Sequence, residues 1–238
     1  MTVGYFITGT DTGVGKTLIA SALIHAFAAH GHKAIGMKPV AAGCAVRDGC
    51  LVSDDVAQLM TASNVSAPLQ QINCYSFEPA IAPHIAARQA GVEIELDVIK
   101  RAYTALADLA DVIIVEGVGG FCVPLSDYVD TMDLAQALDL PVILVVGMRL
   151  GCLNHALLTA AAIKRQGLKL AGWIANGVDA HMTMPAENLH SLKQRIHAPC
   201  LGVVPWQPQA GGLEASAFEA PAFEAIAPLV SSQLLNAY

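Results

Sequence analysis

GTDTGVGKT, residues 9–17, is the most informative segment of this chain, because it has the composition of a loop that binds phosphate. Its glycines let backbone N–H groups converge on phosphate oxygens, Lys16 can neutralise the β- and γ-phosphates, and the Thr17 hydroxyl can ligate Mg²⁺. The spacing departs from the usual G-x-x-x-x-G-K-[ST] pattern, since Thr10 stands where the first glycine is expected and Gly9 lies one residue earlier. The alternative is a glycine-rich turn with a chance lysine, and the flanking elements decide between the two.

The elements around this loop alternate between strand and helix. Residues 3–8 have the apolar pattern of a strand, and residues 18–30 form an Ala- and Leu-rich helix that ends at Gly31. Strand, loop and helix in this order are the context that a phosphate-binding loop requires. The same patterns predict further strands at 33–38, 111–115, 142–146, 170–175 and 200–204, and helices at 53–60, 94–109, 132–138, 153–166, 186–196 and 223–235.

This alternation predicts an α/β fold, a mostly parallel sheet with helices on both faces, built from right-handed βαβ crossovers. A chain of 238 residues lies within the range of one α/β domain, so we expect a single domain over 1–238. The chain is 54% hydrophobic but only 5% aromatic, so its apolar share comes mostly from Ala, Val, Ile and Leu, which suit helices covering a buried sheet. The polar stretch 43–52 is expected to be a loop.

Charge and segment length argue against several classes of partner. The net charge of -7 opposes binding to DNA, RNA or anionic lipid, since these polyanions need clustered Lys and Arg. The longest strongly apolar stretch, 140–148, is about half of the roughly 20 residues that a membrane helix needs. We therefore expect small-molecule ligands and no nucleic-acid or membrane partner. Because no signal-peptide pattern is present, we expect a cytoplasmic location, and the six cysteines, which form no Cys-x-x-Cys pair, are expected to be free thiols.

Two carboxylates suit a metal beside the bound phosphates, because Mg²⁺ takes hard oxygen ligands. Glu116 ends the apolar run DVIIVE, and Asp55 follows the second strand. In open parallel sheets, ligands collect outside the carboxyl ends of strands, which is where the order of elements places Thr17, Lys38 and Glu116. Packing does not explain a buried strand that ends in a charge. For Asp55 the alternative is a helix cap, since Ser-Asp-Asp is typical of a helix start.

Lys38 ends the second strand in the sequence GMKPV, where Pro39 restricts the chain beyond it. A lysine at a strand end is commonly solvated, and that is the alternative to a functional role. Beside a triphosphate, this ammonium would neutralise the charge that develops during phosphoryl transfer.

Seven segments, in order along the chain, together resemble the dethiobiotin synthetase family: GTDTGVGKT, GMKPVAAG, SDD, VEGVGG, PVILVVGMRLGCLNHALLT, LAGWIANGV and GVVPW. The resemblance covers most of the chain and weakens at 47–71, 179–198 and beyond 207. It implies a three-layer fold of the phosphate-loop NTPase type, a requirement for Mg²⁺, and a homodimer with active sites near the interface. It also implies a reaction in which ATP drives the joining of CO₂ to 7,8-diaminononanoate, through a carbamate and a carbamic-phosphoric anhydride, to give dethiobiotin.

The resemblance further implies roles for individual residues. Lys16 and Lys38 would be catalytic, and Thr17, Asp55 and Glu116 would hold Mg²⁺. ATP would contact Gly13, Val14, Gly15, Lys16, Thr17, Leu18, Asp55, Glu116, Gly117, Val118, Gly119, Asn176, Gly177, Pro205, Trp206, Gln207 and Gly212. The substrate would contact Thr12, Lys38, Ala42, Val118, and the turn formed by Gly151, Cys152, Leu153 and Asn154, contributed by the partner subunit. Helix-start packing is the alternative for Cys152 and Leu153.

Three positions depart from the pattern that the resemblance implies. Relatives often carry an acidic residue where this chain has Gly13, a substrate-binding serine where it has Ala42, and an aspartate where it has Gly177. Ala42 is therefore expected to lie near substrate without a hydrogen bond assigned to it.

Two rival functions share features of this sequence. A partner-regulated switch ATPase of the ParA/MinD type has an additional lysine early in the loop, where this chain has Thr10, Asp11 and Thr12. Such proteins also use a basic surface or tail, and residues 223–238 contain no Lys or Arg. An ATP-dependent amide ligase, such as a cobyrinate amide synthase, uses ammonia from a glutaminase domain, which does not fit in 238 residues.

Overall fold

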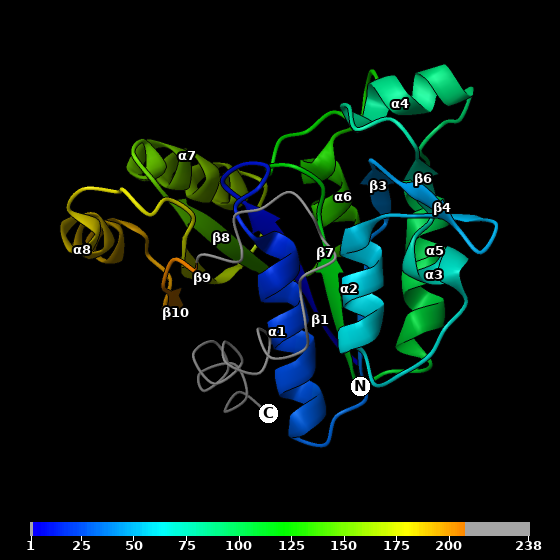
Figure 1. The fold of residues 1–238 in the computed structure, drawn as a ribbon, viewed down its shortest axis with the longest axis horizontal. Helices are drawn as coiled ribbons and strands as arrows, with labels where there is room; N and C mark the ends of the chain where they lie inside the picture. The colour runs from blue at the N-terminus through cyan, green and yellow to red at the C-terminus, as the bar shows by residue number, and fades with distance from the viewer. Residues whose placement is uncertain (1, 208–238) are drawn as a thin grey trace.

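The structure, a computed structural model, describes residues 2–207 (Figure 1). The expected contact at Gly212 and the expected helix at 223–235 lie outside the described residues. Within the described range, no helix combines the length and the apolarity that crossing a membrane would take.

A six-stranded sheet forms the centre of the molecule, and every pairing in it is parallel. The strand order is β10-β9-β8-β1-β7-β2, so the first strand lies in the middle of the sheet. The strands are β1 (Val3–Gly9), β2 (Ala34–Met37), β7 (Val112–Glu116), β8 (Val142–Met148), β9 (Leu170–Gly177) and β10 (Cys200–Val204). The mostly parallel α/β sheet expected from the alternating elements is confirmed.

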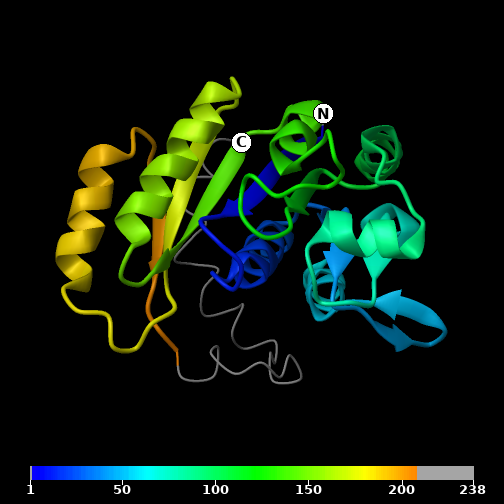
Figure 2. The same ribbon diagram turned by 90° about the horizontal axis from the view of Figure 1, so that it is seen from above.

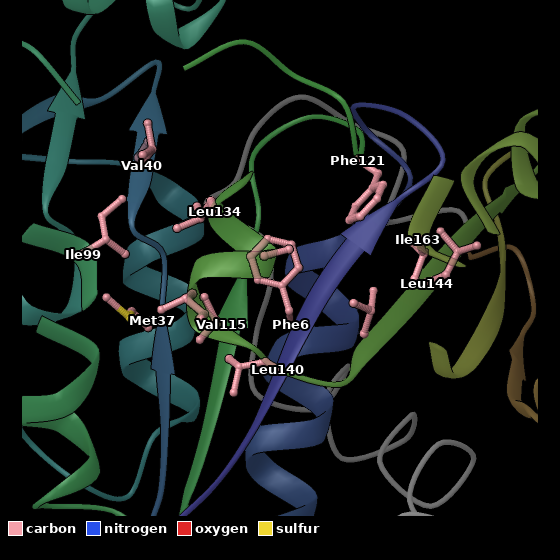
Figure 3. Packing of buried hydrophobic residues seen from close by; sticks show 14 of the residues in the cluster. Phe6, Met37, Val40, Ile99, Val115, Phe121, Leu134, Leu140, Leu144 and Ile163 are labelled. Carbon is pink, nitrogen blue, oxygen red and sulfur yellow. The ribbon is translucent and has the colours of Figure 1, made fainter. Parts of the chain in front are cut away.

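Helices cover both faces of this sheet, because successive strand residues point to opposite sides. The helices are α1 (Lys16–Ala29), α2 (Asp54–Ala62), α3 (Leu69–Ile72), α4 (Pro83–Ala90), α5 (Leu96–Ala107), α6 (Thr131–Leu138), α7 (Cys152–Arg165) and α8 (Pro185–Arg195). Phe6 packs with residues of α5, α6 and α7 in one buried cluster (Figure 3), whereas its neighbour Ile7 packs with α1 in the other. The two apolar clusters therefore lie between the central sheet and the helices on its two faces, which gives a three-layer fold.

Two small strand pairs lie beside the β2 edge of the sheet (Figure 2). The first joins β3 (Val40–Ala42) to β6 (Tyr75–Phe77) in parallel, and the second joins β4 (Ala45–Arg47) to β5 (Cys50–Val52) as an antiparallel hairpin. The hairpin corrects the loop expected at 43–52. Its turn is Asp48-Gly49, both with positive φ, a dipeptide that favours two-residue hairpin turns. Strands of three largely exposed residues have no apolar alternation, so periodicity could not reveal them.

Candidate active site

The phosphate loop connects β1 to α1 at the carboxyl end of the sheet. Gly15 precedes α1 with φ +88, a conformation that side chains other than glycine rarely adopt. A Cβ at Gly15 would lie 2.2 Å from the amide nitrogen of Asn176, and that Nδ2 donates to the Val14 carbonyl at 2.9 Å. Asn176, expected to contact ATP, therefore holds the loop from the end of β9.

Lys16, the first residue of α1, is almost completely buried in the described structure. Its Nζ donates to the Asp11 carbonyl at 3.1 Å, so the ammonium folds back over the loop. Burial lowers the pKa of Lys16 to about 8, and the positive charge of Lys38 contributes to the lowering. The Lys16 ammonium is removed from water, and the nearby negative charges do not fully compensate for its burial. It can therefore gain strongly from binding phosphate oxygens.

Lys38 lies between the two carboxylates that the sequence singled out. Its Nζ is 2.7 Å from Asp55 Oδ2 and 2.6 Å from Glu116 Oε1. Thr17 closes the cluster, because its hydroxyl is 2.9 Å from both Asp55 Oδ1 and Glu116 Oε1. Four residues from four separate elements or connections thus meet in one network, and the solvated surface position that was the alternative for Lys38 is excluded, since its side chain is 4% exposed.

The charges of this cluster depend on one another. Burial lowers the pKa of Lys38, but the charges of Glu116 and Asp55 outweigh burial and raise it, so the ammonium stays charged. Burial raises the pKa of Asp55, yet the charge and hydrogen bond of Lys38 reverse that effect and leave it lowered. Burial raises the pKa of Glu116, and Lys38 offsets only part of the rise. Lys38 is therefore the charge that keeps the acidic pair together.

The donor set of this cluster fits Mg²⁺. Glu116 Oε2 is buried and has no hydrogen-bond partner among the described residues, so one carboxylate oxygen is available to a cation. The Thr17 hydroxyl and an Asp55 carboxylate that is 43% exposed add two further oxygens, and all three residues line the same cavity. Mg²⁺ beside phosphates typically takes one or two carboxylates and completes its shell with water and phosphate oxygens. The described residues contain no group of three or more His, Cys, Asp or Glu side chains that could hold a metal.

A cavity of about 730 Å³ opens directly over this cluster. Twelve of the expected site residues line it: Thr12, Gly13, Gly15, Lys16, Thr17, Leu18, Lys38, Ala42, Asp55, Glu116, Val118 and Gly119. The structure adds a wall that sequence reasoning missed, formed by Gln58, Ala80, Ile81, Ala82, Pro83 and Val123. The sequence signal for this wall is the apolar run 80–83, whose last residue, Pro83, begins α4 and suits the first turn of a helix.

A second cavity, of about 420 Å³, lies at the ends of β9 and β10. Gly177, Pro205 and Trp206, which were expected to contact ATP, line it together with Asp179 and Met182. The loop that carries Asp179 and Met182 received no chemical role from the sequence. A Cβ at Gly177 would meet the Trp206 backbone nitrogen at 2.4 Å, so glycine permits the close approach of the two segments that shape this cavity.

Other expected site residues line neither of these two cavities: Val14, Gly117, Asn176, Gln207, Gly151, Cys152, Leu153 and Asn154. Val14 is buried beneath the loop, where it packs against Gly9 and Gly147. Cys152 is 2% exposed and belongs to the apolar cluster, which supports helix-start packing for that residue. Within one chain, the turn 151–154 is therefore not part of the cavity wall.

Comparisons with known proteins place this geometry in a family. A family model described as "AAA domain" matches residues 3–213. The chain is 55% identical over 203 residues to the ATP-dependent dethiobiotin synthetase BioD of Nitrosospira multiformis, covering 85% of this chain and 88% of the relative. It is also 55% identical over 201 residues to the protein of the same name from Aromatoleum aromaticum, covering 84% and 89%.

Among solved structures, the chain is similar to the septum site-determining protein MinD of Pyrococcus horikoshii complexed with Mg-ADP. The TM-score is 0.58 and the alignment covers 98% of both chains, but the identity of 18% means that this likeness shows the fold alone. It confirms the phosphate-loop NTPase type of α/β fold. With high identity over most of both chains and the phosphate loop open to one cavity, this chain belongs to the dethiobiotin synthetase family of ATP-dependent ligases.

Proposed function

We propose that this chain uses Mg·ATP to carboxylate 7,8-diaminononanoate with CO₂ and close the ureido ring, giving dethiobiotin, ADP and phosphate. The observation that carries the proposal is the convergence of Lys16, Lys38 and the Asp55–Glu116 pair in one cavity. Two cations beside an acidic metal site suit a reaction in which an anionic oxygen attacks a phosphate.

The proposed chemistry requires no nucleophile from the protein. One amine of the diamine takes up CO₂ and releases a proton, and an oxygen of the resulting carbamate attacks the γ-phosphorus while the bond to ADP breaks. The second amine then attacks the carbonyl carbon of the anhydride, and phosphate leaves as the ring closes. Mg²⁺ on Thr17, Asp55 and Glu116 would supply neutralisation of the phosphate charge.

Lys16 and Lys38 hold the reacting anions together in this proposal. Lys16 would move from the Asp11 carbonyl onto the phosphates, and its burial makes that contact stronger than it would be in water. Lys38 would stand between the carbamate and the γ-phosphate, where charge develops during transfer. The apolar wall at 80–83 suits the hydrocarbon chain of the diamine, and Ala42 lies near it without a hydroxyl to donate.

The second cavity is the proposed place of the nucleobase. Its apolar lining includes Met182 and Trp206, and it lies beyond Asn176, which is bonded to the phosphate loop. The turn 151–154 points to a homodimer in the proposal, because it would complete the diamine site of the partner subunit. We expect the enzyme to act in the cytoplasm.

Product analysis tests this proposal. Purified protein is mixed with Mg·ATP, bicarbonate and 7,8-diaminononanoate, and products are identified by mass spectrometry, with controls that omit each component. The expected result is dethiobiotin only in the complete mixture, in step with ADP and phosphate. ATP hydrolysis without dethiobiotin, stimulated by some other ligand, would contradict the synthetase assignment and favour another member of the wider phosphate-loop class.

A further inference from the structure

The first half of the phosphate loop is hydrogen-bonded to the end of β8. Thr10 N donates to the Val145 carbonyl at 3.0 Å, and Gly147 N donates to the Thr10 hydroxyl at 3.2 Å. A third connection joins the side chains beyond them, because the Arg149 guanidinium contacts Asp11 Oδ2 at 2.5 Å. Arg149 lies outside the cavity wall and has no role in the chemistry proposed above.

Asp11 uses three of its oxygens to organise the loop. Its Oδ1 accepts from the Thr12 backbone nitrogen at 2.8 Å, its Oδ2 receives Arg149, and its backbone carbonyl accepts from Lys16 Nζ at 3.1 Å. A shift of Asp11 would therefore displace Thr12 and, until its ammonium moves onto the phosphates, Lys16, and both residues face the cavity.

Arg149 is also connected to the segment that follows it. Its carbonyl accepts from Cys152 N at 3.0 Å, across a turn in which Gly151 has φ +95. This turn begins α7 and contains the residues expected to contact the diamine of the partner subunit. One residue thus bonds to the phosphate loop through its side chain and to the start of α7 through its backbone.

We propose that Arg149 is a positioning residue that couples the phosphate loop to the turn at 150–154, and that Asp11 is its partner in this coupling. The inference rests on the proposed function, in which the phosphate loop binds the triphosphate in this chain's own cavity and the turn completes the diamine site of the partner subunit. In that reaction the carbamate oxygen and the γ-phosphorus must be aligned, and a misplacement of about 1 Å can lower the rate about 100-fold.

The solvent exposure of the Arg149–Asp11 ion pair distinguishes a positioning role from a contribution to the stability of the fold. The side chains of Arg149 and Asp11 are 41% and 47% exposed, and ion pairs in contact with water contribute little to stability. Loss of the pair should therefore change turnover much more than it changes the melting temperature. Another Arg–Asp pair, Arg88–Asp127, has the same 2.5 Å separation and is 67% and 66% exposed, which makes it a matched control.

The test compares Arg149→Gln, Asp11→Asn, the double variant and Arg88→Gln as full-length proteins. Asp11→Asn keeps an oxygen for the Thr12 N–H and removes the charge. We expect each single variant at the pair to lower kcat about tenfold or more, with a melting temperature close to that of the wild type. The double variant should be no slower than the slower single variant, because both changes break one interaction. Arg149→Lys should recover part of kcat, and Arg88→Gln should behave as wild type.

Hydrogen exchange gives a readout that needs no turnover. In Arg149→Gln, backbone exchange should rise both at 10–12 and at 150–154, whereas Arg88→Gln should leave both segments unchanged. If the wild type makes no dethiobiotin, the proposed function fails, and exchange still decides the coupling. The coupling itself is overturned by unchanged exchange in either segment, by a kcat within about twofold of wild type, or by additive losses in the double variant.

Discussion

Lys38 is the residue on which the geometry of the site depends most. Its ammonium contacts Asp55 and Glu116, and its backbone nitrogen and carbonyl bond to Ile72 O and the Asn73 side chain. The residue is thus held at both its backbone and its charged end, which limits the positions its ammonium can reach. Such restriction is what electrostatic stabilisation of a transition state requires.

Lys38→Ala should abolish ring closure and leave much of the nucleotide binding, since the phosphate loop and Lys16 are untouched. We expect a loss of kcat of about 100-fold or more, the size found when one preorganised donor to a transition state is removed. Dethiobiotin formation and Mg·ADP binding by calorimetry measure the two effects. Lys100→Ala, at an exposed position of α5, is the control, and near-normal turnover in Lys38→Ala would remove this lysine from the catalytic set.

The lowered pKa of Lys16 predicts that nucleotide binding depends on pH. Its pKa of about 8 in the folded protein lies below its ordinary value, so between these two values the unfolded chain holds more protons than the folded one. The contribution of Lys16 to stability therefore rises with pH across that window. Phosphate oxygens favour the charged form, so Mg·ADP binding above pH 8 should take up a proton at Lys16.

Calorimetric titration in two buffers of different ionisation enthalpy measures this uptake. At about pH 8.5 we expect uptake of a large fraction of one proton per bound Mg·ADP, and at about pH 6.5 almost none, because Lys16 is then already charged. Equal uptake at both pH values would contradict the lowered pKa of Lys16.

At the scale of elements, the start of α2 positions the Asp55 carboxylate. Ser53 caps the helix, and its Oγ accepts from Val56 N at 3.2 Å. Asp55 then falls in the first turn, where its carboxylate reaches Thr17 and Lys38. From the sequence, a helix cap and a metal ligand were alternative interpretations of Ser-Asp-Asp. In the structure Ser53 forms the cap, and Asp55 bonds to Thr17 and Lys38.

Ser53→Ala should lower the free energy of unfolding by about 1 kcal/mol, the usual effect of removing a capping hydroxyl. Urea denaturation measures the change, and Ser53→Thr, which keeps a hydroxyl, serves as the control. Because the cap also orients Asp55, the alanine variant should bind Mg·ADP more weakly than the threonine variant. Equal stability of the two variants would show that the hydroxyl does not stabilise α2.

At the scale of the whole molecule, nucleotide should stabilise the fold, because the phosphate loop that binds it exists in the folded protein and not in the unfolded chain. Mg·ADP at about 100 times its Kd should add about 2.7 kcal/mol to the free energy of unfolding. For a chain of this size, that corresponds to a rise in melting temperature of about 5–10 °C. Differential scanning calorimetry measures it.

Removal of Mg²⁺ is the control for the rise in melting temperature caused by Mg·ADP. Adding EDTA should diminish the ADP effect in the wild type, and Glu116→Gln should be less sensitive to EDTA, since one metal-facing carboxylate is gone. An unchanged melting temperature with saturating Mg·ADP would contradict the assignment of the loop.

Short-range patterns in the sequence were enough to predict the local features of this protein. The alternation of strand and helix, the phosphate loop at 9–17 and the cap at Ser53 follow from short-range patterns, because periodicity and backbone preferences act within a few residues. The three-layer fold followed from them. Patterns of this kind could not show the hairpin at β4–β5, and although the run 80–83 is visibly apolar, they could not place it against the cavity.

Contacts between residues far apart in the chain became visible only in the folded protein. Thr17 and Glu116 are 99 residues apart in the chain, and they come within 2.9 Å because β1 pairs with β7 in the register that sets Ile7 beside Glu116. Likewise, Arg149 reaches Asp11 because β8 adjoins β1 on its other side. Strand register and order arise from packing of the whole core, so a residue's own neighbours in sequence do not encode them.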